Sequence, residues 1–364
     1  MTIVAHNHPF VVGVDTHARS HALSVIVATT GEEVGSKQFP ASAAGLAKAM
    51  AWVGRTTGAD LDTLWVIEGA ATFGARLAAL VEATGYRVVE AARMSARGNR
   101  GLGKSDPLDA RRIATAVLRL PLDRLRNLRQ DSGARSGLRV LVAAREMMTT
   151  ERTAAINALT ALLRAADLGI DARKPLTATQ IAEVTRWRAR NEEIGLSTAR
   201  TEAIRLAKRI IALGQDLEAN KRNTVELLEL TPAKALLNEP GIGPITAAVA
   251  MTSWSHAGRL RDEAAFASLA GVNPIPASSG NTVRYRLNRG GDRRLNRALH
   301  TAVITRMRFH EETKTYVQRR TAEGKTTKEI RRCLKRYLAR QIYRTLNANT
   351  ISAPNTTPTA ITPA

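Results

Sequence analysis

The stretch GKSDPLDARR, residues 103–112, places two aspartates three residues apart in a strongly basic neighbourhood. Asp106 at the N-cap, Pro107 at the first helical position and Asp109 at the third would begin a helix, with both carboxylates at the positive end of its dipole. Residues three apart share one face of the first turn, so the same carboxylates could also bind a cation. This fragment alone favours capping, and only carboxylates elsewhere in the chain can decide between capping and cation binding.

Two further acids, Asp15 and Glu68, each end an apolar run that is typical of a strand, FVVGVD and LWVIE. If these strands are neighbours, both acids project from one edge, and a helix that begins at Asp106 could bring its aspartates there. Four converging carboxylates repel one another strongly unless divalent cations lie between them. Two cations about 3.5–4 Å apart could clamp the oxygens of a phosphodiester displacement. We therefore expect a catalytic Mg²⁺ or Mn²⁺ site formed by Asp15, Glu68, Asp106 and Asp109.

The runs around these acids predict an α/β domain with the ribonuclease-H-like order of elements. Three closely spaced strands with short turns favour an antiparallel meander, and alternating helix and strand follow. A doubly wound Rossmann sheet would lack the meander and would carry a glycine-rich turn after its first strand. The expected strands are 10–15, 21–28, 33–39, 64–68 and 86–91, and the expected helices are 41–55, 73–84 and one that begins at Asp106.

Residues 138–230 carry apolar residues at helical spacing among charges. Such long amphipathic helices pack as an internal hairpin or as a coiled coil with a partner chain, and both arrangements stay open. Residues 237–254, LNEPGIGPITAAVAMTSW, then show a helix-hairpin-helix pattern within a mainly α region. We predict that Gly241 and Gly243 form a tight turn that binds a nucleic-acid phosphate together with the next helix N-terminus.

Positive charge is concentrated in two windows of a chain whose net charge is +22. Residues 93–140 contain twelve basic and four acidic side chains, and residues 284–344 contain nineteen and five. This distribution favours DNA or RNA held at two places over merely solvated helical faces. The arginines expected to bind phosphates independently of sequence are Arg284, Arg286, Arg289, Arg293, Arg294 and Arg297.

The single cysteine, Cys333, excludes disulfides within the chain and cysteine-based zinc sites. His17 and His21 are four residues apart but lie in strand-like sequence, and we expect no metal site from them. The N-terminal residues lack the pattern of a secretory signal, and no apolar run reaches bilayer length. We expect a soluble, cytoplasmic protein without a membrane partner.

The order of these features resembles the RuvC-type resolvases, and longer blocks narrow the resemblance to the insertion sequence 110 transposase family. GVDTHARSHALSV, VIEGAATFG and KSDPLDARRIA look like the N-terminal blocks of that family. LNEPGIGPITAAVAMT and AGVNPIPASSGNTVRYRLNRGGDRRLNRALHTA resemble its C-terminal domain. The resemblance covers about residues 10–310 in the same order.

This resemblance implies a DNA transposase that cuts and rejoins strands through a phosphoserine–DNA intermediate. Asp15, Glu68, Asp106 and Asp109 fall on the metal-binding acids of the family, and Ser279 falls on its nucleophilic serine. Ser278 stands where many members carry glutamine, and the alignment of Pro274, Pro276 and Gly280 favours Ser279. From the residues alone, SSG is an ordinary loop. A guide (bridge) RNA that selects donor and target DNA is also implied.

The expected organisation is a RuvC-like domain at 8–130, a helical coiled-coil linker domain at 131–231, a C-terminal transposase domain with the serine at 232–347 and a disordered tail at 348–364. A reaction that joins two DNA sites also requires paired protomers, so we expect a dimer or tetramer. Three alternatives stay open: a site-specific DNA invertase of the same chemistry, a metal-dependent Holliday-junction resolvase without a covalent intermediate, and a non-enzymatic nucleic-acid-binding protein whose acids are helix caps.

Overall fold

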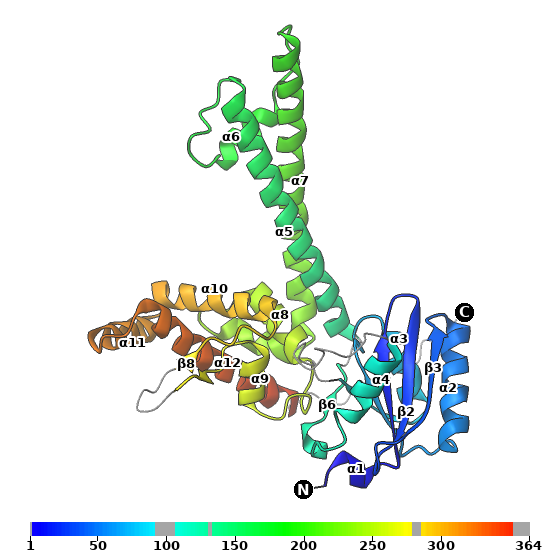
Figure 1. Cartoon of the computed structure of the whole chain (residues 1–364). Coiled ribbons are helices and arrows are strands. Elements are labelled where there is room, and N and C mark those ends of the chain that lie inside the picture. The colour runs from blue at the N-terminus through cyan, green and yellow to red at the C-terminus, as the bar shows by residue number, and fades with distance from the viewer. Residues whose placement is uncertain (1, 92–105, 130–132, 279–284, 352–364) are drawn as a thin grey trace. The chain divides into compact units, whose positions relative to one another are not determined.

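The computed structural model describes residues 2–91, 106–129, 133–278 and 285–351. The chain divides into two compact units, Met1–Asp131 with Ser255–Ala265, and Ser132–Trp254 with Phe266–Ala364. The second unit is nearly all helical (Figure 1). Within the described ranges, no helix is both long and apolar enough to cross a membrane. The finer division into three domains and a tail stays a prediction.

The first unit is built on a mixed six-stranded sheet with the strand order β3-β2-β1-β4-β5-β6. β1, β2 and β3 form an antiparallel meander, β4 and β5 lie parallel to β1, and β6 is antiparallel to β5. The predicted meander and order of elements are confirmed, and each predicted boundary up to residue 91 lies within two residues of the observed one. The strands are β1 Phe10–Thr16, β2 Ser20–Val27, β3 Glu33–Pro40, β4 Leu64–Ile67, β5 Arg87–Glu90 and the unpredicted β6 Arg126–Asn127.

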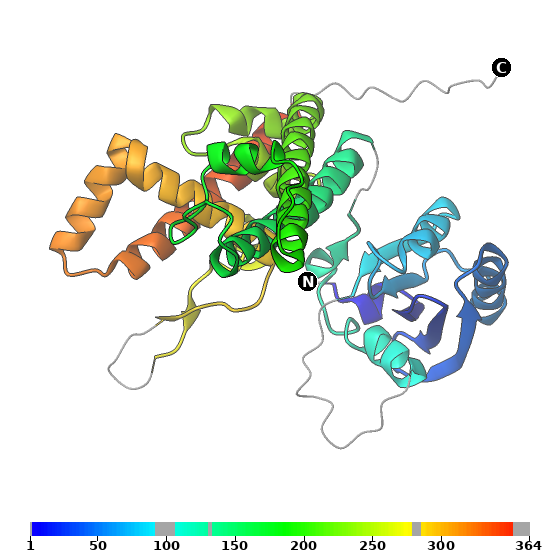
Figure 2. The same ribbon diagram turned by 90° about the horizontal axis from the view of Figure 1, so that it is seen from above.

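Helices cover both faces of this sheet (Figure 2). Val12 and Val14 of β1 belong to the apolar cluster with α2, Ala43–Thr57, and α3, Ala75–Ala83. Val11 belongs to the opposite cluster with α4, Asp106–Thr115. Because both faces are buried, β1 reads as an unbroken apolar run rather than an alternating one. A short helix α1, Val4–Asn7, and a 3₁₀ helix, Leu122–Arg124, complete the unit.

The second unit contains two long helices, α5 Gly133–Ala165 and α7 Ile194–Glu229, which pack along each other with α6, Ala178–Thr185, at their tip (Figure 1). The pairing is antiparallel, since Arg145 donates to the Leu217 carbonyl over 2.8 Å and Asn220 to the Leu141 carbonyl over 3.0 Å. The internal hairpin, one of the two arrangements that the sequence allows, is therefore present within one chain.

The remaining helices of the second unit are α8 Pro244–Trp254, α10 Arg293–Phe309, α11 Glu311–Ala322 and α12 Thr327–Ile351. The helix α9, Glu263–Leu269, begins in the segment that belongs to the first unit and ends in the second. The residues before the glycine turn, Pro232–Asn238, form a 3₁₀ helix. This segment differs from the first α-helix that a helix-hairpin-helix requires. Two short strands, β7 Ile275–Pro276 and β8 Tyr285–Arg286, pair antiparallel.

Candidate active site

Asp15 and Glu68 lie at the carboxyl ends of neighbouring parallel strands. Val14 of β1 is in register with Ile67 of β4, so the two acids come at equivalent positions one residue later. The Glu68 N–H donates to the Val14 carbonyl over 2.9 Å. The Thr16 hydroxyl donates to the Glu68 carbonyl over 2.7 Å. These bonds bring both acids to one edge of the sheet, as the sequence predicts.

The helix α4 reaches this edge because β1 carries a glycine where the two elements touch. A Cβ atom at Gly13 would lie 2.1 Å from the Ala110 carbonyl oxygen and 2.6 Å from the Ala114 nitrogen. Any side chain there would push α4 away from the strand. Asp109, on the first turn of α4, is thereby held near the end of β1. Asp106 begins the helix, and its side chain lies outside the described residues.

The charges at this edge act on one another. The pKa of Glu68 is raised, first by desolvation of its carboxyl group and then by the negative charges of Asp15 and Asp109. His17 opposes this shift. The raised pKa of Glu68 thus reflects burial first and repulsion between the carboxylates second.

Two of the acids have basic side chains beside them. The His17 Nε2 lies 3.2 Å from Asp15 Oδ2, and Arg112 donates to Asp109 Oδ1 over 3.0 Å. Among the described residues, no three His, Cys, Asp or Glu side chains stand close enough together to hold a metal ion. The metal site of Asp15, Glu68, Asp106 and Asp109 therefore stays a prediction.

In the sequence, the predicted nucleophile stands between β7 and β8, which pair antiparallel with Ile275 opposite Arg286. Ser278 is exposed near the end of the first arm. Ser279 and Arg284 lie outside the described residues, so their roles stay predictions.

Two family models match the chain, one containing all four acids and the other containing Ser279. The model described as Transposase, for DEDD transposases of IS110 type, matches residues 12–166. The model described as Transposase IS116/IS110/IS902 family matches residues 233–318. The chain belongs to the IS110 family of transposases. This membership confirms the sequence-based resemblance and decides against a non-enzymatic binding protein.

Two insertion element proteins are similar to this transposase. The uncharacterized 42 kDa protein of IS900 from Mycobacterium paratuberculosis is 28% identical over 351 residues, which cover 82% of this chain and 86% of the relative. The uncharacterized 43.6 kDa protein of IS110 from Streptomyces coelicolor is 32% identical over 123 residues, which cover 33% of this chain and 30% of the relative.

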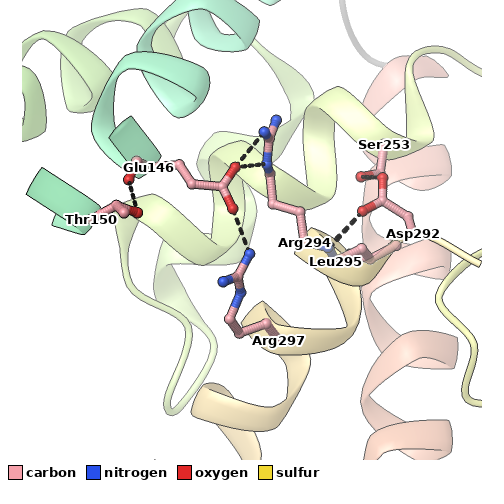
Figure 3. A network of polar contacts seen from close by, with 7 residues as sticks. All are labelled: Glu146, Thr150, Ser253, Asp292, Arg294, Leu295 and Arg297. Carbon is pink, nitrogen blue, oxygen red and sulfur yellow. Dashed lines mark hydrogen bonds and ion pairs between the residues drawn. The ribbon is translucent and has the colours of Figure 1, made fainter. Parts of the chain in front are cut away.

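In the transposase, two of the predicted phosphate-binding arginines are engaged by a single acid, Glu146 of α5 (Figure 3). Arg294 donates to Glu146 Oε2 through Nε over 2.9 Å and through Nη2 over 2.5 Å. Arg297 donates to Oε1 over 2.6 Å. These bonds, with Arg294 contributing most, lower the pKa of Glu146. The local surplus of positive charge is therefore smaller than the sequence suggests.

The other described arginines of this group, Arg286, Arg289 and Arg293, are exposed. Arg293 is the first residue of α10, and Asp292 caps that helix by accepting from the Arg294 and Leu295 N–H groups over 2.9 and 3.0 Å. The cap explains the Asp-Arg-Arg order at the start of α10.

The packing around residue 241 explains why it is a glycine, which the sequence did not indicate. Its φ is +75°, and a Cβ atom there would lie 2.8 Å from the Ala302 carbonyl oxygen of α10. Arg306 of the same helix donates to the Pro240 carbonyl over 2.6 Å. A Cβ atom at Gly243, by contrast, would meet open space. The glycine turn thus packs on α10, and a phosphate-binding role for Gly241 and Gly243 stays a prediction.

Sequence reasoning also missed Thr16, His17 and Arg112 at the acid edge. His17 stands two residues after Asp15, and this short spacing was an available signal. The expectation of no metal site from His17 and His21 did not consider a contact of His17 with Asp15. The His21 side chain is buried in β2, and burial is the main cause of its lowered pKa.

Proposed function

We propose that this transposase cuts DNA strands at the carboxyl edge of β1 and β4, within a ribonuclease-H-like (RuvC-type) domain. In the proposal, Asp15, Glu68, Asp106 and Asp109 hold Mg²⁺ or Mn²⁺. The observation that supports it is the register of β1 with β4, which brings Asp15 and Glu68 to one edge of the sheet. Desolvation first, and then the charges of Asp15 and Asp109, raise the pKa of Glu68, and a bound cation would offset this repulsion. When bound, the cations would polarise the scissile phosphodiester and stabilise the departing oxygen.

The protein side chains have separate tasks in this proposal. Thr16 and the paired backbone of β1 and β4 position Glu68 against Asp15. Gly13 lets α4 approach β1, and Asp109 on the first turn of α4 would join them as a ligand. Arg112 orients the Asp109 carboxylate through its hydrogen bond. Ligands whose free oxygens are held by neighbouring groups lose less freedom when they bind a cation.

We propose further that Ser279 is the nucleophile. Its Oγ would form a bond to the phosphorus while the bond from phosphorus to one deoxyribose oxygen breaks. The serine proton would pass to a base or to solvent, and the displaced oxygen would take up a proton. A serine hydroxyl needs such activation because it is a weak nucleophile. The phosphoserine ester conserves the free energy of the phosphodiester bond that is broken, so rejoining requires no nucleotide hydrolysis.

The partners follow from the family and from the charge. We propose donor and target DNA on the basic surfaces, a guide (bridge) RNA, and a dimer or tetramer that brings two DNA sites together. Net charge of +22, concentrated in two windows, supports a nucleic-acid partner of either kind. The proposed site of action is the cytoplasm.

The test is a labelled suicide DNA substrate resolved on a denaturing gel, with the wild type, Ser279→Ala and Ser278→Ala. We expect a protease-sensitive protein–DNA band with the wild type and Ser278→Ala and none with Ser279→Ala. A band lost in Ser278→Ala instead would move the nucleophile by one residue. Clean Mg²⁺-dependent nicking without a covalent band in any protein would contradict the serine chemistry and favour a resolvase. Asp15→Asn and Glu68→Gln should abolish cleavage in each case.

A further inference from the structure

Glu90 ends β5, the strand next to β4, and forms an ion pair with Arg259. Glu90 is in register with Ile67 on one side and with Arg126 of β6 on the other. The Arg259 Nη2 lies 3.2 Å from Glu90 Oε2. The Arg259 side chain is only 6% exposed and that of Glu90 23% exposed. This pair therefore sits at the sheet edge one strand along from Glu68.

Arg259 reaches this edge from a distant part of the sequence. The segment Ser255–Ala265 follows α8 in the chain but belongs by its contacts to the first unit. Asn127 of β6 donates to the Gly258 carbonyl over 3.4 Å, next to the ion pair. The second family match thus contributes an arginine to the sheet that carries the acids.

Two further arginines, Arg126 and Arg129, lie near the ion pair of Glu90 and Arg259. Arg126 and Arg129 lie close enough to Arg259 to lower its pKa, after the larger effect of burial, and Glu90 only partly offsets them. The Arg129 Nε is buried and, within the described residues, has no hydrogen-bond partner. Arg259 is thus a buried guanidinium group under the electrostatic influence of two further arginines, of which Arg126 is exposed and Arg129 is half-buried. Guanidinium groups that lie close together repel one another, and a bound anion would offset this repulsion.

We propose that Arg126, Arg129 and Arg259 form a phosphate-binding site for the backbone of the DNA strand that enters the carboxylate edge. Guanidinium groups match phosphate oxygens through paired N–H donors and cannot lose their charge. Neighbouring strands of a sheet are about 4.8 Å apart, so the site would hold a phosphate next to the one being cut. The identity of this strand rests on the proposed function, whereas the anion site rests on the arginine cluster alone.

A purely structural role for the Arg259–Glu90 pair predicts a different outcome. If the pair only fastened Ser255–Ala265 to the sheet, removing either partner would lower stability without changing affinity for DNA. In a phosphate site, the two partners have opposite effects, because Glu90 competes with phosphate for the arginines. Arg259→Gln should then weaken DNA binding, and Glu90→Gln should strengthen it.

The experiment measures binding of a fluorescein-labelled DNA duplex by anisotropy, in EDTA and over a series of salt concentrations, with the full chain. Arg259→Gln should lower affinity about tenfold and reduce the slope of log affinity against log salt by about 1. Glu90→Gln should raise affinity several-fold. Arg126 is exposed, so Arg126→Gln can be tested even if Arg259→Gln does not fold. This variant should also reduce the slope of log affinity against log salt.

The matched control is the ion pair of Arg200 and Glu192 in the second unit, with side chains 5% and 18% exposed. Arg200→Gln and Glu192→Gln should leave the slope unchanged. The phosphate site would be overturned if the variants of Arg259, Arg126 and Glu90 lowered thermal stability but left the salt dependence of binding unchanged, as in these controls. Failure of the proposed function is separate, since it would show as full cleavage by Asp15→Asn in Mg²⁺ whatever the binding results.

Discussion

Thr16 and Glu68 are joined by a hydrogen bond that leaves the carboxylate of Glu68 free to act. The Thr16 Oγ1 donates to the backbone carbonyl of Glu68 over 2.7 Å, and the Glu68 N–H donates to Val14 over 2.9 Å. Together they extend the pairing of β1 and β4 beyond the last residue of β4. Thr16 therefore determines where the chain of Glu68 leaves the sheet.

Replacing Thr16 by valine should weaken the site while keeping the shape of the side chain. The lost bond should lower the free energy of unfolding by about 1 kcal/mol. The Mg²⁺ concentration for half-maximal DNA cleavage should rise, because Glu68 is held less firmly. Thr16→Ser, which keeps the hydroxyl, should restore the metal dependence. Equal metal dependence in Thr16→Val and Thr16→Ser would show that the bond has no positioning role.

Gly13→Ala should separate α4 from β1. The added Cβ would lie 2.1 Å from a backbone oxygen, which cannot move aside as a flexible side chain can. We expect a loss of about 3 kcal/mol in stability and loss of cleavage, measured by denaturant unfolding and by the DNA substrate.

Gly54→Ala is the matched control for this change. Gly54 lies within α2, and a Cβ there would have no atom within 4 Å. Alanine should stabilise the helix by about 0.5–1 kcal/mol. A Gly13→Ala protein as stable as the Gly54→Ala protein would contradict the close approach of α4.

Glu146→Gln should increase affinity for DNA, because Arg294 and Arg297 no longer share a carboxylate. The salt dependence of binding should become steeper by about 1 to 2 in the log–log slope. Glu151→Gln is the control, since Glu151 lies on the same helix and pairs with Arg209. If both variants change affinity equally, general charge and not the two arginines of α10 is responsible.

A fall in pH should weaken the contact of Glu146 with Arg294 and Arg297. The pKa of Glu146 is lowered from its ordinary value of 4.5, so the folded state favours the ionised carboxylate. Its contribution to stability is present above pH 4.5 and is lost as the pH falls through the lowered pKa. The midpoint temperature of thermal unfolding should therefore fall more steeply with decreasing pH for the wild type than for Glu146→Gln. Parallel curves would contradict the sign of this linkage.

The sequence alone determined much of the first unit and of its acid edge. Apolar runs interrupted by short turns predict β1 to β5 and their order, because burial and backbone pairing act locally along each strand. Asp15 and Glu68 each follow such a run, so their meeting at one edge followed from parallel pairing of the two strands. The motifs by which the family can be recognised are local as well, so the sequence alone was enough to identify it.

The tertiary structure decided the contacts that join distant segments. Local periodicity contains no information on which side chain lies opposite another 148 residues away, as Arg294 does with Glu146. The same limit hid Arg259 beside Glu90, because Ser255–Ala265 packs with the first unit although it follows α8. It also hid why Gly13 and Gly241 are glycines, since only the approach of α4 and α10 removes the space for a Cβ. Partner choice among charged and small residues depends on packing, and packing is settled only when the whole chain folds.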